Sequence, residues 1–148
     1  MSLIDYSIQY PDQFIHGIHT ENNVVNDKRI KAEVFFNPKF NIESGYKEFS
    51  INWMDNPGAI DQLLNQKKDV DKRRFEYGYA VFNRKKMKEI LFYDELFGIN
   101  RAPLEKDDLN DENIYHGNII YNKDISRDDI KLIAFCLVGV SFEEVISR

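Results

Sequence analysis

The sequence lacks the features that mark several large classes of protein. Its single cysteine, Cys136, excludes an internal disulfide, and the apolar neighbours Phe135 and Leu137 predict a buried side chain instead of a nucleophile. The most apolar run, Leu132 to Val140, has about half the length that a membrane-spanning helix needs. No basic region followed by an apolar stretch opens the chain, so we expect no secretory signal. These absences predict a cytoplasmic protein without membrane attachment.

The motifs of common catalytic centres are missing too. Gly-x-Ser-x-Gly does not occur, and the seven glycines are scattered instead of forming a phosphate-binding loop. There is no His-Glu-x-x-His pattern and no pair of cysteines for a metal. The acidic pairs Asp94-Glu95 and Asp107-Asp108 are typical of solvated surface in an acidic chain. These absences favour a non-enzymatic protein without deciding the question.

The composition is that of a folded domain. Of 148 residues, 43% are apolar, 30% are charged and 14% are aromatic, which predicts one globular domain spanning residues 1–148. The net charge of -5 argues against binding along a nucleic-acid backbone, which needs clustered cations. One basic run extends from Lys67 to Arg74, but Asp69 and Asp71 interrupt it, and we interpret it as a solvated connector.

Hydrophobic periodicity predicts an α+β fold with an antiparallel-rich mixed sheet. Alternation is clear in Tyr46–Trp53, where Phe49, Ile51 and Trp53 share one face of a strand. Further strands are predicted at Ile30–Phe36, Phe75–Asn83, Lys88–Tyr93 and His116–Tyr121. Gly78 indicates a bulge or a close backbone approach.

Five segments carry helix signals. Lys85–Leu96 fits a helix as the alternative to the strand Lys88–Tyr93. One inserted helix begins at Asn56-Pro57 and continues to about Gln66. Ser126-Arg127-Asp128-Asp129 is a capping box that opens an apolar core helix ending at Gly139, and Ser141-Phe142-Glu143-Glu144 is a second box before a terminal helix. A short helix is also possible from Asp12 to His19. We expect the C-terminal helices to pack on the sheet.

The three histidines are the most informative residues. His16 and His19 lie in Phe14-Ile15-His16-Gly17-Ile18-His19, and His116 lies in Tyr115-His116-Gly117-Asn118. If the segments meet, His16, His19 and His116, with Asn118, would line one ligand pocket. Three histidines can also hold Zn or another divalent metal, but the sequence favours ordinary hydrogen-bonded histidines, and no cofactor is predicted.

The glycine after each histidine allows two interpretations. It can let a ligand approach the backbone beside the imidazole, or it can simply relieve a turn or strand end. An apolar residue followed by His16-Gly17 is similar to the His-Gly-Thr signature of the ADP-ribosyltransferase fold, in which the histidine holds the nicotinamide ribose. Ile18 stands where that signature has threonine, and no later glutamate lies in a matching catalytic motif.

A longer pattern resembles a family of short bacterial proteins with no assigned function. The resemblance runs from about residue 14 to 121 and rests on five segments: His16-Gly17-Ile18-His19, Phe36-Asn37-Pro38, Phe49-Ser50-Ile51, Tyr77-Gly78-Tyr79-Ala80 and Tyr115-His116-Gly117-Asn118-Ile119. His16 replaces an arginine of the family pattern. The resemblance implies a bacterial fold unit in which His19 and His116 stand out, and it supplies no reaction.

Three functions remain open from the sequence. The leading hypothesis is a bacterial cytoplasmic interaction or accessory module with an unknown protein partner. The second is a small enzyme, or a ligand- or metal-binding protein, that uses the histidine cluster. The third is an immunity-type protein or antitoxin whose acidic charge steers it to a basic partner.

Overall fold

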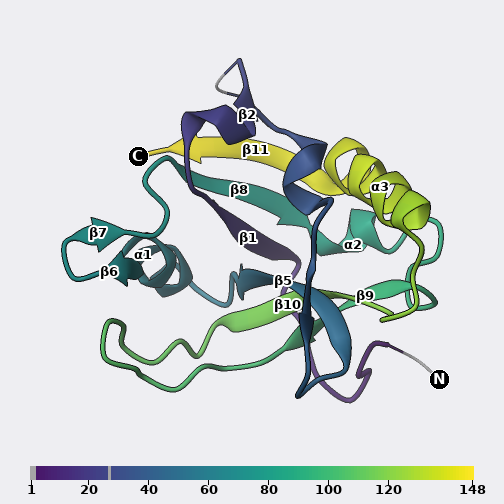
Figure 1. The fold of residues 1–148 in the computed structure, drawn as a ribbon, viewed down its shortest axis with the longest axis horizontal. Coiled ribbons are helices and arrows are strands. Elements are labelled where there is room, and N and C mark those ends of the chain that lie inside the picture. Colours follow the sequence, from purple (N-terminus) through teal and green to yellow (C-terminus); the bar gives the residue numbers. More distant parts are fainter. Residues whose placement is uncertain (1–2, 27) are drawn as a thin grey trace.

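A seven-stranded antiparallel sheet forms the centre of the computed structural model, which describes residues 3–26 and 28–148 (Figure 1). The strand order is β11-β8-β1-β5-β10-β9, with β4 also paired to β5. The strands are β1 Gln13–Ile18, β4 Lys39–Asn41, β5 Tyr46–Trp53, β8 Gly78–Asn83, β9 Phe97–Arg101, β10 His116–Tyr121 and β11 Phe142–Ser147. The predicted α+β class with an antiparallel-rich sheet is therefore confirmed.

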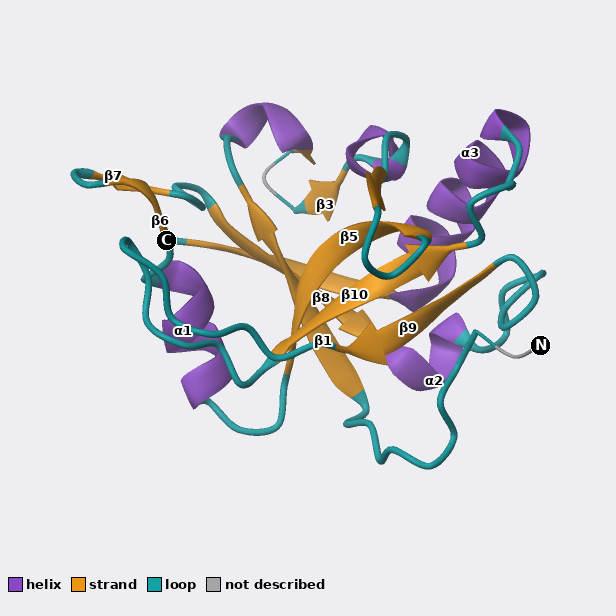
Figure 2. Cartoon of the chain, turned by 60° about the horizontal axis from the view of Figure 1, so that its bottom comes forward, coloured by secondary structure: helices purple, strands orange, loops and turns teal. Residues whose placement is uncertain are grey.

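Short helices and two hairpins surround this sheet (Figure 2). The α-helices are α1 Gly58–Leu64, α2 Arg84–Met87 and α3 Arg127–Cys136, and a π-helical turn, Leu137–Ser141, extends α3. Two 3-10 helices span Glu21–Asn23 and Ala32–Phe35, and the hairpins pair β2 Val24–Val25 with β3 Arg29–Ile30 and β6 Lys67–Asp69 with β7 Lys72–Arg73. Figure 1 shows α1 beside the β6–β7 hairpin, and α3 at the opposite side of the sheet.

The central strand β1 is covered on both faces. Phe14 and Ile18 belong to the large apolar core that also contains residues of α3, whereas Ile15 belongs to a smaller core with Leu63 of α1 and Phe75. Successive side chains of a strand point to opposite faces, so His16 points to the same face as Phe14 and Ile18. A histidine thus occupies a position that its strand otherwise fills with core residues.

The sheet divides between β1 and β5. All six residues of β1 pair with β8, from Gln13–Asn83 to Ile18–Gly78. Against β5, β1 pairs only at Phe14–Trp53 and Ile15–Asn52. Farther along, the same edge of β5 is taken by β4, which pairs with Tyr46, Lys47 and Glu48. Between these pairings β1 and β5 diverge, beginning at His16.

Aromatic packing holds the two parts of the sheet together where β1 and β5 still pair. The Phe14 ring centroid lies 5.6 Å from that of Trp53 and 5.3 Å from that of Phe82. The Trp53 indole donates from Nε1 to the carbonyl oxygen of Asn100 in β9, at 2.9 Å. Gly117 makes this bond possible, because a Cβ at that position would lie 2.4 Å from Trp53 Nε1 and 2.1 Å from the Asn100 oxygen.

Several predicted elements are confirmed. The strands Tyr46–Trp53 and His116–Tyr121 have the predicted bounds, and α1 follows Asn56-Pro57, with the Gly58 amide donating to Asn56 Oδ1 at 2.8 Å. The Ser126 hydroxyl caps α3 by accepting from the Asp129 amide at 3.1 Å.

The close backbone approach predicted at Gly78 is also present. A Cβ there would lie 1.9 Å from the carbonyl oxygen of Ile146 in β11, and Gly78 has a φ of +152°. Only glycine tolerates both conditions without strain.

The predictions for the two ends of the chain were wrong in part. Asp12–His19 contains a strand, β1, because its apolar residues are buried on both faces. The second capping box lies at the start of β11 instead of a helix, because Phe142–Ser147 pairs with β8 along the sheet edge. Of the two predicted C-terminal helices, only α3 is a helix, and it packs on the sheet through Ile130, Ile133 and Ala134.

Predictions for three further segments also need correction. Ile30–Phe36 is mainly the 3-10 helix Ala32–Phe35. Lys88–Tyr93 forms turns, and Phe92 has a φ of +68°, which interrupts a strand. The helix does not end at Gly139, because the π-helical turn runs through it, and Phe135 of α3 is 61% exposed instead of buried.

Candidate functional site

A cleft of about 300 Å³ lies where β1 and β5 diverge. One wall is the end of β1, and the other is the middle of β5, which pairs with β10 but has no partner on its β1 edge. The residues before β8 and around β4 complete the cleft. Its lining is His16, Gly17, Ile18, His19, Asn23, Ile30, Val34, Asn37, Lys39, Glu48, Phe49, Ser50, Arg74 and Phe75. Two of the three histidines therefore share one concave site, as the pocket hypothesis requires of them.

His16 is fixed by a hydrogen bond across the gap in the sheet. Its Nδ1 lies 2.9 Å from the carbonyl oxygen of Ser50, and its half-buried ring packs 4.9 Å from Phe35 and 6.5 Å from Phe49, centroid to centroid. Because a carbonyl oxygen can only accept, Nδ1 carries the proton and donates. Burial lowers the pKa of His16 to about 4, although the bond to Ser50 opposes this effect. The imidazole is therefore neutral at pH 7.

His19 repeats the arrangement at the mouth of the cleft. Its Nδ1 lies 2.9 Å from the carbonyl oxygen of Arg74, and its ring centroid lies 5.0 Å from that of Phe75. Partial burial lowers the pKa of His19, the bond to Arg74 opposes the shift, and the charges of Arg74, Lys68 and Lys39 lower it further. This imidazole also donates from Nδ1.

The two rings therefore present the same chemistry to the cleft. With Nδ1 donating to a backbone carbonyl, Nε2 of His16 and of His19 carries the lone pair on the other side of the ring. Such a nitrogen accepts a hydrogen bond from a ligand O–H or N–H group, or takes a proton from it. For His16, the divergence of β1 and β5 produces this state, because it leaves the Ser50 carbonyl without a strand partner in β1.

The carboxylate that lines the cleft has hydrogen-bond partners, whereas the cations that line it form no ion pairs. Both oxygens of Glu48 accept hydrogen bonds from the β4–β5 turn, from Asn41 at 2.7 Å and from Ser44 at 3.3 Å. Within residues 3–26 and 28–148, neither Lys39 nor Arg74 forms an ion pair. The cleft thus holds two unpaired cations and one carboxylate that is already bound.

Gly17 allows an aromatic wall to lie on β1. A Cβ at Gly17 would lie 2.3 Å from the Phe75 ring, so Phe75 sits directly against the strand backbone between His16 and His19. Gly117 likewise accommodates Trp53. Both glycines therefore permit the close approach of an aromatic side chain, and each lies one residue from an end of its strand.

His116 lies behind this wall, outside the cleft. It is 8% exposed, and its Nδ1 lies 2.7 Å from the carbonyl oxygen of Ala102. It lines a cavity of about 30 Å³ that shares Ser50, Arg74 and Phe75 with the cleft. Burial lowers the pKa of His116, while the bond to Ala102 and the charge of Glu48 raise it and that of Arg74 lowers it. The two His-Gly segments are thus neighbours separated by shared walls.

Asn118 does not reach the cleft. It is buried in β10, where its amide N–H donates to Asn100 Oδ1 at 3.0 Å and its Nδ2 donates to the same oxygen at 3.3 Å. The Asn118 side chain thus binds Asn100 of the neighbouring strand β9. Of the four residues predicted to share one pocket, His16 and His19 line the cleft, whereas His116 and Asn118 belong to the sheet behind it.

A three-histidine metal site is not formed. Across residues 3–26 and 28–148, no group of three or more His, Cys, Asp or Glu side chains is placed to hold one metal ion.

No helix in the same part of the chain combines the length and the apolar character needed to span a bilayer.

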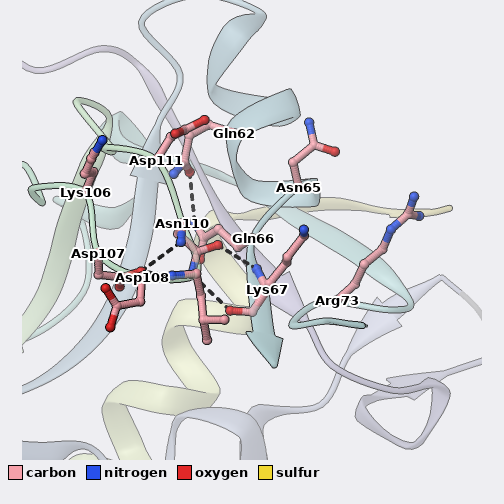
Figure 3. A pocket seen from close by; sticks show the side chains of 11 residues that line it. Gln62, Asn65, Gln66, Lys67, Arg73, Lys106, Asp107, Asp108, Asn110 and Asp111 are labelled. Atoms are coloured by element: carbon pink, nitrogen blue, oxygen red, sulfur yellow. Dashed lines mark hydrogen bonds between the residues drawn. The ribbon is translucent and has the colours of Figure 1, made fainter. Parts of the chain in front are cut away.

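A larger hollow of about 630 Å³ lies between α1, the β6–β7 hairpin and the loop after β9 (Figure 3). Asn110 closes its base, because its Nδ2 donates to the Lys67 carbonyl at 3.0 Å and its Oδ1 accepts from the Lys67 amide at 2.7 Å. The charged residues of the hollow, Arg73, Asp108 and Asp111 among them, are exposed to solvent. We prefer the smaller cleft as the functional site because it holds two imidazoles with a lowered pKa, of which that of His16 is half-buried.

Sequence reasoning missed the residues that complete the cleft. Arg74 ends the basic run that was interpreted as a solvated connector, and its carbonyl instead fixes His19. Lys39 lies in no motif, and Ser50 was named only within the Phe49-Ser50-Ile51 segment of the resemblance, without a role in a site. Only Phe75, directly after the cations and at the start of an apolar strand pattern, gave a signal that this segment returns to the core.

Comparison of the chain with models of protein families, with characterised proteins and with solved structures gives no match.

Proposed function

We propose that the protein binds a small molecule in the cleft between β1 and β5, with His16 and His19 accepting hydrogen bonds from it. The observation that carries the proposal is the shared state of the two rings. Both donate from Nδ1 to a backbone carbonyl, and both have a lowered pKa. The cleft volume of about 300 Å³ lies at the lower end of the range for small-ligand pockets.

A neutral imidazole at position 16 of β1 stabilises the fold less than an apolar side chain would, which favours a functional reason for the histidine. His16 occupies a core-facing position of β1, where an apolar residue would fill the space without a polar atom to satisfy. Ionisable groups with perturbed pKa values in concave sites are enriched at functional sites. His16 combines the core-facing position, the perturbed pKa and the cleft.

The test uses the fact that the chain has only three histidines. A long-range ¹H–¹⁵N spectrum resolves three imidazoles, and it is recorded while a library of small metabolites is added. The dinucleotide NAD belongs in the library because of the similarity of His16-Gly17 to the ADP-ribosyltransferase signature. A cleft ligand shifts His16 and His19 together, and His116, behind the wall, is the internal reference.

Two results decide against the cleft. A compound that binds and shifts only His116, or none of the three imidazoles, places its site elsewhere. If no compound shifts His16 and His19, the interaction-module hypothesis gains, and affinity capture with the wild-type protein and with a His16→Gln variant becomes the next comparison. A partner retained by both proteins would fit an interaction surface away from the cleft.

A further inference from the structure

We infer that the ligand of the cleft carries an anionic group, phosphate or carboxylate, which Lys39 and Arg74 bind. The inference rests on the proposed function and adds the chemical class of the ligand. Its starting point is a contrast in charge: the chain has a net charge of -5, yet the cleft contains two cations without carboxylate partners.

The two cations approach the cleft from different elements. Lys39 begins β4, on the β5 side, and Arg74 follows the β6–β7 hairpin, next to β1. Both line the cleft, and the charges of both act on His19 at its mouth. A ligand group held between them would therefore bridge the two parts of the divided sheet.

The one carboxylate of the cleft does not neutralise them. Glu48 Oε1 accepts from Asn41 and Oε2 accepts from Ser44, so both of its oxygens are directed to the β4–β5 turn. Its charge acts on His116 behind the wall, whereas the charges that act on His16 and His19 are all positive. The potential at the mouth of the cleft is thus positive in an acidic protein, which attracts an anion.

Arg74 is positioned for this role by its neighbours. Its guanidinium carbon lies 5.5 Å from the centroid of the Phe75 ring, and its backbone is held at both polar groups, by His19 at the carbonyl and by the Gln66 carbonyl at the amide. A planar guanidinium beside a buried ring binds carboxylate or phosphate through two parallel hydrogen bonds. Lys39 supplies the second charge as a point cation.

The experiment compares three probes: inorganic phosphate, succinate, and succinamide, the neutral analogue of succinate. Each is titrated at constant low ionic strength into the wild-type protein, and affinity is read from the imidazole resonances of His16 and His19. We expect phosphate or succinate to shift both resonances, and succinamide to bind at least about tenfold more weakly, because hydrogen bonds from the two cations to a charged oxygen are stronger than those to a neutral amide. The relative effects of phosphate and succinate show which anion the site prefers.

Variants identify the groups responsible. Arg74→Gln and Lys39→Gln are each expected to weaken anion binding by about tenfold. Lys72→Gln is the matched control, because Lys72 is an exposed cation of the same hairpin that lies outside the cleft lining, and a change of less than about twofold is expected there.

The outcomes separate the two proposals. If succinamide shifts His16 and His19 as strongly as succinate does, the cleft binds ligands but the anion inference is wrong. The inference is also overturned if neither anion shifts the two resonances, or if Lys72→Gln weakens binding as much as Arg74→Gln, since a diffuse surface potential would then explain the attraction. In either of these cases, a library compound that shifts both imidazoles would still support the cleft as the site.

Discussion

The two His-Gly segments share a dipeptide but have opposite surroundings. His116-Gly117 lies in β10, paired on both sides along the strand, and its ring is buried against the Ala102 carbonyl. His16-Gly17 lies in β1 where the strand has lost its partner β5, and its ring lines a cleft. The same dipeptide is therefore part of the core in one strand and part of a candidate site in the other. What differs is the pairing of the strand edge, which neither dipeptide encodes.

The comparison also shows what the glycines do. Each accepts an aromatic side chain on the backbone, Trp53 at Gly117 and Phe75 at Gly17. Trp53 is fixed by its bond to Asn100 inside the core, whereas Phe75 forms the wall that separates the cleft from the cavity of His116. Substitutions at the two glycines are therefore expected to differ in size and in kind.

Gly117→Ala should give the largest loss of stability. The new Cβ would lie 2.1 Å from the Asn100 carbonyl oxygen, a backbone atom of the paired strand β9, and 2.4 Å from Trp53 Nε1. Strain from overpacking and the loss of the Trp53 hydrogen bond together predict a decrease of about 4 kcal/mol in the free energy of unfolding. Urea denaturation measures it, and a loss below about 1 kcal/mol would show that the close approach at Gly117 is not required.

Acid should destabilise the protein through His16. Its pKa is about 4 in the folded chain and near 6.5 when unfolded, so the unfolded state alone binds a proton between these values. The free energy of unfolding is therefore expected to fall as the pH drops from about 6.5 to 4, by roughly 3 kcal/mol from this residue.

The variant His16→Gln isolates this contribution. It cannot titrate, so its stability should depend less on pH across that interval, and the remaining decrease belongs to other groups, among them His19 and His116, whose pKa values are also lowered. Denaturation curves at pH 7, 5.5 and 4.5 provide the comparison. Equal pH dependence in the variant and the wild type would contradict a buried, neutral His16.

Gly17→Ala should have a smaller effect on stability and a larger one on the site. The Cβ would lie 2.3 Å from the Phe75 ring, which is a side chain and can rotate away, so we expect a decrease of about 1–2 kcal/mol. Displacing Phe75 alters the wall beside His19, and the resonance of His19 should shift more than that of His116. The opposite order would mean that Phe75 supports the core alone.

Asn110→Ala should have the smallest effect. The substitution removes the two hydrogen bonds from the loop after β9 to the backbone of Lys67, which are exposed to solvent, and about 0.5–1 kcal/mol is expected. Faster amide hydrogen exchange at Lys67 checks the loss of this contact. His16 should be unaffected, because the cleft does not include this loop.

The sequence predicts part of this fold and misses part of it for physical reasons. β5 and β10 were predicted with the right bounds, β5 from its clear alternation of apolar and polar side chains. β1 was mistaken for a helix because a strand buried on both faces has no such alternation. β11 was mistaken for a helix because a capping box is a local signal, and the pairing of this segment with β8 is decided by distant residues.

The candidate site was predicted only as far as its histidines. His16 and His19 were identified as ligand candidates from residue type and spacing, and both line the cleft. The involvement of Lys39 and Arg74 depends on where β4 displaces β1 along β5, which no local pattern records. The site is therefore a consequence of strand pairing more than of any motif.

The most direct test of the account is a pH titration of the three imidazoles by long-range ¹H–¹⁵N spectroscopy without ligand. We predict that burial keeps His16 neutral down to about pH 4, and that the bond to the Ser50 carbonyl holds its proton on Nδ1. A His16 that titrates near pH 6.5, or that carries its proton on Nε2, would contradict the neutral acceptor on which the proposed ligand site depends.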